Sequence, residues 1–546
     1  MPTPHPASRR RLRALAAGFA LLLAAATAGR AEDLTLTLLH TNDFHARLAP
    51  VTAGGSRCRA EDAAARKCFG GVARLATEIA ALRASRPHPV LLDAGDRFQG
   101  SLFYTYYKSA ALKPFFELLN YQAMTLGNHE FDDGPAELAR FLDGLTVPVI
   151  SANVDTAAEP LLAGRIGATL VLPVGGEKLG VIGLTTPATA SNAKPGAAVR
   201  FTDPVAATRA AVASLHGQGV NRIVVLSHLG VTEDKALAEA VDGVAVIVGG
   251  HSHTLLRDGD PRAAGGSPQV VKSPSGKPVL IVQGYFAGVY LGVLQVTLDD
   301  DGVPLAWQGE PVLLDDSISE DPAVRGFVSA LEKPLAPLLN QPMGISEVAL
   351  VGERSACRFD ECNLGNLIAD AIVEQTKSQG TQIAIINGGG IRAGIPAGPV
   401  TIGQILEVLP FANTISTFDL GGADLRAALE YGVGRAEHPG NEGTGRFPQV
   451  SGLRYRWNAA APVGQRIVAV EVRQPDGAFA PLDPTAIYHI ATHDYLRTRG
   501  DGYSVFKEKA INAYDGGALV SEALATFIAN HTPVAPALEG RISRTP

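Results

Sequence analysis

The chain has 546 residues, of which 46% are hydrophobic, and its formal net charge at pH 7 is −7. This length exceeds that of one ordinary domain and predicts two domains, each with a sizeable core. Because the chain is acidic and has no basic block after residue 13, its composition argues against a protein that binds nucleic-acid polymers.

The N-terminal segment has the organisation of an export signal. The basic stretch SRRRLR is followed by the apolar stretch ALAAGFALLLAAATAG, and small residues up to Ala31 offer a cleavage site. The apolar stretch is shorter than the ~20 residues of a membrane span, and SRRRLR partly fits a twin-arginine signal. We expect a cleaved signal over residues 1–31 and a periplasmic or secreted protein without a membrane anchor; an uncleaved anchor is the alternative.

The first large unit of the chain reads as a layered α/β domain, because short apolar runs alternate with amphipathic runs from Leu34 to about Asp300. Predicted strands cover residues 34–40, 89–96, 123–128, 147–153, 222–228, 244–250 and 278–284. Apolar residues at helical spacing predict helices over residues 70–84, 134–145 and 203–218.

The pattern changes after this unit. The stretch SEDPAVRGFVSALEKPLAPLLNQP predicts a connecting helix that is broken by its prolines. A second unit follows, with a predicted helix over 363–376, a strand over 382–387, a helix over 401–409 and then β-rich sequence to about residue 510.

The four cysteines form two local pairs, Cys58 with Cys68 and Cys357 with Cys362. Four cysteines allow three pairings. Neither spacing is that of a CxxC motif, and an exported chain meets an oxidising compartment. We predict the two local disulfides; a zinc knuckle is the alternative, which the lack of histidines close by in the sequence disfavours.

Polar residues follow five of the predicted strands, and such strand ends meet at one edge of an α/β sheet. Imidazole, carboxylate and amide groups of this kind bind zinc, manganese, cobalt or iron. A shared carboxylate can bridge two ions ~3.5–4 Å apart, as in two-metal hydrolysis. The five clusters contain Asn42, Asp43 and His45; Asp96; Asn128 and His129; His228; and His251 and His253.

The motifs DFH, GDRFQGS, GNHEFD, SHLG and GGHSH resemble those of calcineurin-like metallophosphoesterases, and their order and spacing are similar to the 5′-nucleotidase family. The stretches CRFDECNLGNLIADA, INGGGIRAGI, VLPFANT and RGDGYSVF resemble that family's C-terminal nucleotide-binding domain. The resemblance implies a four-layer α/β/β/α metallophosphoesterase domain over 32–318, a helical linker over 319–345, and a mixed α+β nucleotide-binding domain over 346–546.

The resemblance also implies two divalent metal ions, zinc, manganese or cobalt. The first metal is expected on Asp43, His45 and His253, and the second on Asn128, His228 and His251, with Asp96 as the bridge. Many relatives have Asn or Gln where this chain has His253, which leaves the metal preference of that site open.

In the GNHEFDDG stretch, the resemblance implies that His129 faces the phosphoryl group of the substrate and that Asp132 holds the His129 ring in place. Phe131 is expected to pack beneath them. Glu130 and Asp133 are expected to face solvent or cap a helix.

In the second domain, the resemblance assigns Arg358 and Arg392 to substrate anions, Asn387 to the base and Asp501 to the ribose. Phe411 and Tyr495 are expected to sandwich the base, a contact worth ~1–3 kcal/mol. The chain departs from the family at three positions near this pocket: Tyr495 replaces Phe, Ala412 replaces Gly, and Arg499, where a small residue is usual, is a candidate for a further anion contact.

The function implied is an exported 5′-nucleotidase that uses metal-activated water on nucleoside monophosphates, with di- and triphosphates and UDP-sugars as further candidates. Two relatives of the same fold stay open, a 2′,3′-cyclic-nucleotide phosphodiesterase/3′-nucleotidase and a thiosulfohydrolase, and the Arg358, Phe411 and Tyr495 set argues against the second. A non-catalytic nucleotide-binding protein would have lost metal ligands, and none is missing. A serine hydrolase fits poorly, because GHSHT ends on Thr254 rather than Gly.

Overall fold

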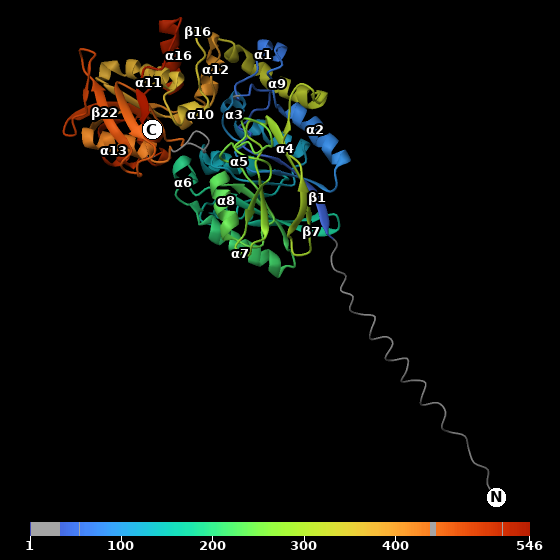
Figure 1. Cartoon of the computed structure of the whole chain (residues 1–546). Helices are drawn as coiled ribbons and strands as arrows, with labels where there is room; N and C mark the ends of the chain where they lie inside the picture. Colours follow the sequence, from blue (N-terminus) through green and yellow to red (C-terminus); the bar gives the residue numbers. More distant parts are fainter. Residues whose placement is uncertain (2–32, 54, 437–443, 499, 516, 546) are drawn as a thin grey trace.

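The computed structural model describes residues 1, 33–53, 55–436, 444–498, 500–515 and 517–545. The predicted export signal and the anion contact predicted for Arg499 lie outside these residues. Figure 1 shows two lobes, a blue-to-green one formed by the first half of the chain and an orange-to-red one that contains the C-terminus. The architecture is the two-domain α/β arrangement that the sequence predicts.

The first lobe contains two large sheets. The larger one has the order β14 (Pro304–Gln308), β13 (Tyr290–Leu298), β1 (Leu34–Thr41), β2 (Pro89–Asp93), β3 (Ala123–Thr125) and β4 (Val149–Ile150), and β15 (Val312–Leu313) pairs with β13. The smaller one has the order β11 (Gln269–Lys272), β12 (Pro278–Val282), β10 (Val246–Val248), β9 (Arg222–His228), β7 (Glu177–Thr185) and β6 (Thr169–Val174). Strands β1 to β4 are parallel, and so are β7, β9, β10 and β12. All seven predicted strands are therefore present.

Three apolar cores separate four layers in this lobe. Leu36 and Leu38 of β1 pack with Val224 and Leu226 of β9 between the two sheets. Two further cores lie on the outer faces of the sheets, under helices on either side. This confirms the predicted α/β/β/α layering. The helices of the lobe are α1 (Ala60–Ala64), α2 (Val72–Ser85), α3 (Leu102–Tyr107), α4 (Lys113–Leu118), α5 (Gly134–Leu142), α6 (Thr189–Asn192), α7 (Pro204–Gly217) and α8 (Val231–Ala240), with a short strand pair, β5 (Val154–Asp155) and β8 (Arg200–Phe201).

The connecting helix α9 (Pro322–Leu339) runs without interruption through Pro334 and Pro337, so the predicted break is wrong. Both prolines are exposed, whereas Leu335 and Leu339 on the other side of the helix are buried. A proline removes one helical hydrogen bond. On an exposed face the freed carbonyl can bind water, while burial of the leucines stabilises the helix on the other side.

The second lobe is built on a five-stranded sheet with two smaller sheets beside it. The strands are β20 (Pro448–Ser451), β17 (Ile383–Asn387), β24 (Ile487–His493), β19 (Ile415–Gly421) and β25 (Ile511–Tyr514); then β23 (Phe479–Pro481), β22 (Ile467–Arg473), β21 (Leu453–Asn458) and β26 (Ile542–Thr545); and β16 (Pro342–Ser346) with β18 (Gly398–Thr401). The helices are α10 (Arg354–Cys357), α11 (Asn363–Gln375), α12 (Ile402–Val408), α13 (Gly422–Val433), α14 (Asp494–Arg497), α15 (Ser504–Glu508) and α16 (Val520–His531). The β-rich prediction missed α13, whose Leu425 and Leu429 are buried at helical spacing.

Both predicted disulfides are present. The Cα atoms of Cys58 and Cys68 are 5.7 Å apart, and those of Cys357 and Cys362 are 5.1 Å apart. Each bond closes a short loop, so neither links the two lobes. Among the described residues, no helix combines the length and the apolar character that a membrane-crossing segment requires.

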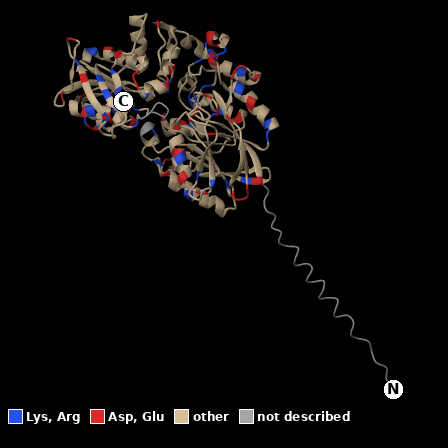
Figure 2. Cartoon of the chain, in the orientation of Figure 1, with Lys and Arg blue, Asp and Glu red and all other residues tan. Residues whose placement is uncertain are grey.

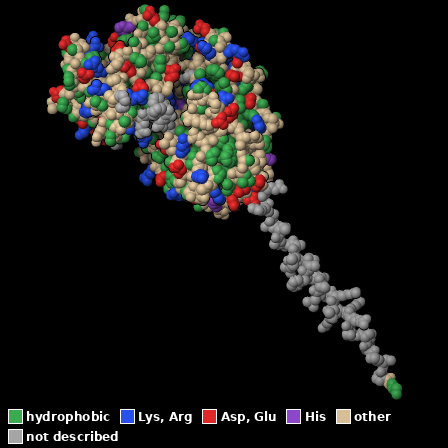
Figure 3. Space-filling model, viewed as in Figure 1, with side chains coloured by type: hydrophobic (Ala, Val, Ile, Leu, Met, Phe, Trp, Pro, Cys, Tyr) green, Lys and Arg blue, Asp and Glu red, His purple; other side chains and the backbone are tan. Residues whose placement is uncertain are grey.

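The visible surface is mixed in character. In the cartoon of Figure 2, basic and acidic residues are interspersed along the elements of both lobes. In Figure 3, hydrophobic side chains lie among charged and polar ones on the face that is shown.

Candidate metal centre and substrate cavity

The ends of parallel strands bring the predicted metal ligands together. Asp43 and His45 follow β1, Asp96 follows β2, Asn128 follows β3, and His228 ends β9. The two sheets face each other, so strand ends from both contribute to one point. Three overlapping groups of ligand atoms lie within 4.8 Å of one another: Asp43, His45 and His253; His45, Asp96 and His129; and Asp96, His228 and His251.

The first group joins two imidazoles and a carboxylate. The Nε2 atom of His253 lies 3.0 Å from Nε2 of His45 and 3.3 Å from Oδ1 of Asp43. The Nδ1–H of His45 donates to the carbonyl of Phe98 at 3.2 Å, so its Nε2 carries a lone pair directed at His253. Two such nitrogens and a carboxylate form a donor set that suits a divalent cation.

The second group centres on Asp96. Its Oδ2 atom lies 3.2 Å from Nε2 of His228, whose Nδ1–H donates to the carbonyl of Ala94 at 2.6 Å. That carbonyl orients the ring and directs the other nitrogen to the metal side. Within the described part of the chain, the buried Oδ1 atom of Asn128 has no hydrogen-bond partner. A buried amide oxygen without a partner costs free energy, and a metal ion would supply the missing contact.

The electrostatics of three of the four predicted histidine ligands fit metal binding; at the fourth, His228, the Asp96 carboxylate outweighs burial and raises the pKa to about 10. Burial lowers the pKa of His45, His251 and His253 well below the usual range, so these imidazoles are neutral, the form that binds metals. Burial raises the pKa of Asp43 to about 7, and the Asp96 carboxylate adds to this effect. Burial alone would also raise the pKa of Asp96, but the neighbouring His228 and His129 hold it well below its usual value.

The backbone at these residues is strained. The φ angles are +49° at Asp43, +51° at His45, +57° at Asp96, +72° at His251 and +58° at His253. L-residues rarely adopt this left-handed region, and such strain is concentrated at functional sites. Five predicted ligands therefore share a conformation that packing alone does not favour.

Glu130 holds two of the ligand loops together. It is fully buried, and its carboxylate accepts hydrogen bonds from four backbone N–H groups: those of Gly127 at 2.6 Å, Asp96 at 3.0 Å, Arg97 at 2.7 Å and Phe98 at 3.1 Å. The prediction that Glu130 faces solvent or caps a helix is wrong. The loop after β2 turns its N–H groups toward the loop after β3, and the carboxylate satisfies them.

Asp133 and Phe131 behave as expected. Asp133 is exposed at the N-cap position of α5 and pairs with Lys108 at 2.9 Å. Phe131 is fully buried beneath the loop.

His129 and Asp132 form a close pair at the edge of the metal group. The Nδ1 atom of His129 lies 2.6 Å from Oδ2 of Asp132, and its Nε2 lies 4.0 Å from Oδ2 of Asp96. Burial lowers the pKa of His129, but the carboxylates of Asp132 and Asp96 outweigh burial and raise it above the usual value. The two carboxylates therefore favour the protonated form of the ring, with Nε2–H on the side of the predicted metals.

The second lobe covers this centre with cationic and aromatic side chains. Nη2 of Arg392 lies 3.1 Å from Nε2 of His45. The Phe411 ring stacks on the His129 ring, with centroids 5.7 Å apart and planes at 20°. Arg392 also lies over Phe411, 5.7 Å from its centroid.

Asn387, Tyr495 and Asp501 form a hydrogen-bonded group farther from the metals. Nδ2 of Asn387 donates to Oδ2 of Asp501 at 2.6 Å, and the Tyr495 hydroxyl donates to Oδ1 of Asp501 at 2.9 Å. The hydroxyl that distinguishes Tyr495 from Phe therefore anchors the ring to the carboxylate predicted to meet the ribose.

These side chains line one cavity of about 350 Å³ between the lobes, a volume in the range of small-molecule sites. Its lining includes Asp96, Asn128, His129, Asp132, His251 and His253 from the first lobe, and Arg354, Arg358, Asn387, Arg392, Phe411, Tyr495 and Asp501 from the second. Asp43, His45 and His228 are buried beside the lining residues. The structure thus brings all the predicted metal and substrate residues to one place.

Sequence reasoning missed Arg354 and the ion pair beneath the metal loops. Arg354 lines the cavity, and its Nη1 donates to the Ser252 carbonyl of the first lobe at 2.7 Å. Arg354 lies four residues before Arg358, and this spacing could have predicted that both arginines face the same cavity. Arg97 pairs at 2.5 Å with the buried Asp93, the last residue of β2. Helical or strand periodicity in the sequence does not predict such a contact.

Comparison with known proteins agrees with this geometry. A calcineurin-like phosphoesterase model matches residues 36–255, and a 5′-nucleotidase C-terminal domain model matches residues 342–508. The snake venom 5′-nucleotidase of Naja atra is 38% identical over 93% of this chain and 98% of the venom protein. The crystal structure of a 5′-nucleotidase precursor from Thermus thermophilus is 45% identical, with a TM-score of 0.88 over 94% of this chain and 99% of that one. A Thermus sulfate thiohydrolase, 21% identical with a TM-score of 0.76 over 93% of this chain and 96% of that one, shares the fold alone.

Proposed function

Because the chain belongs to the 5′-nucleotidase family and is a metal-dependent phosphoester hydrolase, we propose that it is an exported enzyme that removes the 5′-phosphate from nucleoside monophosphates with two divalent metal ions. Nucleoside di- and triphosphates and UDP-sugars are further substrates in this proposal. The observation that carries it is the shared cavity, in which the metal-ligand groups and the arginine and aromatic side chains meet.

The two ions, zinc, manganese or cobalt, would be held by the ligands described above, with Asp96 between them. Its position in both the His45 and the His228 groups supports this bridging role. Bound divalent ions supply a water of lowered pKa and offset charge on a phosphoryl group. Because His253 adds a second imidazole beside His45, the first site favours borderline cations such as zinc over magnesium.

The chain's own residues would orient and neutralise the substrate. His129, held by Asp132, presents its Nε2–H to a phosphoryl oxygen and offsets charge that develops there. The guanidinium groups of Arg358 and Arg392 bind further phosphate oxygens in a planar fork. Both line the cavity with His129, so all three can contact one anion.

In this proposal, the second lobe recognises the nucleoside part of the substrate. Phe411 and Tyr495 line the same cavity as Asn387 and Asp501. We propose that the two rings stack the base, that Asn387 contacts its edge and that Asp501 accepts from the ribose hydroxyls. In the described conformation Phe411 stacks on His129, so substrate entry would require the Phe411 loop to move from that ring.

The limits of the domains and the export signal remain predictions. Helix α9 falls inside the predicted linker 319–345, and β16, which starts at Pro342, pairs with β18 of the second lobe. Export over residues 1–31 rests on the sequence pattern.

The second candidate is the 2′,3′-cyclic-nucleotide phosphodiesterase/3′-nucleotidase, which would use the same metal centre and base clamp. Both alternatives are tested by hydrolysis of AMP, ATP, UDP-glucose, 2′,3′-cyclic AMP and bis-p-nitrophenyl phosphate. The nucleotide products are separated by chromatography, and the base-free ester is followed by release of p-nitrophenol. A 5′-nucleotidase gives its highest kcat/KM with AMP or another 5′-nucleotide. A highest value with the cyclic substrate would support the second candidate, and no preference for nucleotides over the base-free ester would refute both.

A further inference from the structure

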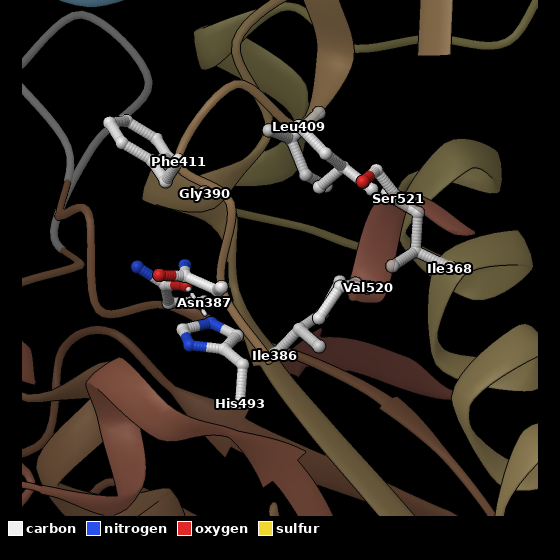
Figure 4. A pocket seen from close by; sticks show the side chains of 11 residues that line it. Ile368, Ile386, Asn387, Gly390, Leu409, Phe411, His493, Val520 and Ser521 are labelled. Carbon is white, nitrogen blue, oxygen red and sulfur yellow. Dashed lines mark hydrogen bonds between the residues drawn. The ribbon is translucent and has the colours of Figure 1, made fainter. Parts of the chain in front are cut away.

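A histidine that does not line the large cavity contacts Asn387 from behind. His493 ends β24 and is only 4% exposed, and β24 runs parallel to β17, which ends at Asn387. Nε2 of His493 lies 2.9 Å from Oδ1 of Asn387. Figure 4 shows the two side chains facing one another across this contact, on the opposite side of a small cavity from Leu409, Val520 and Ser521.

The backbone determines which nitrogen of His493 carries the proton. The N–H of Leu496 donates to Nδ1 at 3.4 Å, where His493 acts as the N-cap of α14. Nδ1 is therefore the acceptor, and the proton is on Nε2, which donates to Asn387. Burial lowers the pKa of His493 to about 3, so the ring is neutral at any physiological pH and keeps this arrangement.

The contact continues through Asn387 to the cavity. With Oδ1 facing His493, the NH₂ group of Asn387 faces Asp501 and donates to its Oδ2 at 2.6 Å. The Tyr495 hydroxyl donates to the other oxygen of Asp501 at 2.9 Å. A carboxamide has four hydrogen-bonding positions, so one N–H and one lone pair of Asn387 stay available toward the cavity. Their directions are set by the partners at both ends of the amide.

We propose that His493 is a positioning residue for nucleobase recognition: it holds the Asn387 carboxamide in one orientation, so that a donor and an acceptor are presented to the base edge between Phe411 and Tyr495. This inference rests on the proposed function, because it requires that a base occupies that part of the cavity. The edge of a base carries its hydrogen-bond donors and acceptors in one plane. An amide that is already fixed in that plane binds the edge without a further loss of conformational entropy, whereas a rotating amide must first be ordered. His493 itself does not contact the substrate.

The test compares His493→Phe, which keeps a ring but removes the donor, with His493→Gln, whose side-chain amide can place an N–H near the same position. The Phe variant should raise KM for AMP and Ki for adenosine by roughly 3- to 10-fold, the effect of one lost hydrogen bond, with kcat unchanged. The Gln variant should restore most of the affinity. KM for bis-p-nitrophenyl phosphate, which has no base, should stay within about twofold of the wild-type value.

Two controls separate positioning from a general structural effect. His489 lies on the same strand and is hydrogen-bonded to Asp419 at 2.6 Å, so His489→Phe removes a histidine from β24 without touching Asn387 and should leave KM unchanged. In an Asn387→Ala background, His493→Phe should have no further effect on Ki for adenosine, because its partner is gone. A thermal-unfolding curve for each variant shows whether it is folded.

Three results would overturn the inference: an unchanged KM for AMP in folded His493→Phe, an equal rise for the base-free ester, or an effect that persists without Asn387. Failure of the proposed function looks different. In that case the wild-type protein itself would not prefer AMP over the base-free ester, and adenosine would not inhibit it.

Discussion

Replacing Glu130 with glutamine should destabilise the first domain and weaken its metal site. The carboxylate accepts four backbone hydrogen bonds, two on each oxygen: Oε2 from Gly127 and Asp96, and Oε1 from Arg97 and Phe98. In Glu130→Gln, one oxygen becomes an NH₂ group that faces two N–H donors. Hydrogen bonds to a charged group are worth about 1.5–3 kcal/mol each, so the loss of two costs roughly 3–6 kcal/mol.

A matched control is available in the next helix. Glu137 is also buried, but its Oε1 atom accepts both hydrogen bonds from Ser109, which the carbonyl oxygen of an amide can retain. Its other oxygen pairs with Arg140, whose side chain is 66% exposed. Glu137→Gln should therefore cost at most about 1 kcal/mol.

The assay measures stability and metal affinity separately. Urea unfolding gives the free-energy change, and titration calorimetry of chelator-treated protein with Mn²⁺ or Zn²⁺ gives the affinity. Because Glu130 binds the N–H of Asp96 itself, we expect Glu130→Gln to lose about 10- to 100-fold in metal affinity, as other supporting residues do, and Glu137→Gln to lose none. Equal stability and equal metal affinity in the two variants would refute the role assigned to Glu130.

Further predictions concern the metals, the two aspartates of the DAGD stretch and one strained loop. Removal of metal with EDTA should abolish hydrolysis of AMP, and Mn²⁺, Co²⁺ or Zn²⁺ should restore it; full activity in metal-free protein would contradict a metal centre. Asp96→Asn should lower kcat by orders of magnitude with a small change in stability. Asp93→Asn removes the carboxylate that pairs with the buried Arg97, so it should cost about 3–5 kcal/mol in urea unfolding but leave the kcat of the folded fraction unchanged. Equal losses of kcat in the two variants would mean that the roles are misassigned. Ala412 has a φ angle of +51°, so Ala412→Gly should stabilise the second domain by about 1 kcal/mol, and a lower urea midpoint would count against strain at this position.

The candidate metal centre was largely predictable from the sequence because its signal is local. Each ligand stands directly after an apolar run, so the strand and its polar end are visible together, as with Asp96 after β2 and His228 at the end of β9. Parallel strand order then requires that such ends meet at one edge. The disulfides were predictable for a similar reason, since each pair is close in sequence.

Other features depend on contacts between distant segments, which no local pattern encodes. Glu130 looks like a solvent-exposed residue in its own stretch, but three of the four N–H groups that it binds come from the loop after β2, more than 30 residues earlier. The prolines of α9 predict a break, but the buried leucines on the opposite face keep the helix intact. In both cases burial and hydrogen bonding outweigh the local preference.

The amino-acid sequence by itself determined the fold class, the family and the candidate metal ligands, because periodicity, family motifs and strand-end chemistry are properties of short segments. Only the tertiary structure decided that the two lobes meet with Phe411 on His129 and Arg354 at Ser252, and that His493 contacts Asn387 within the second lobe. Such relations depend on distances between segments that are separated by tens to hundreds of residues. Hydrogen bonds and ring contacts act over a few ångströms, so these pairings exist only once the chain has folded.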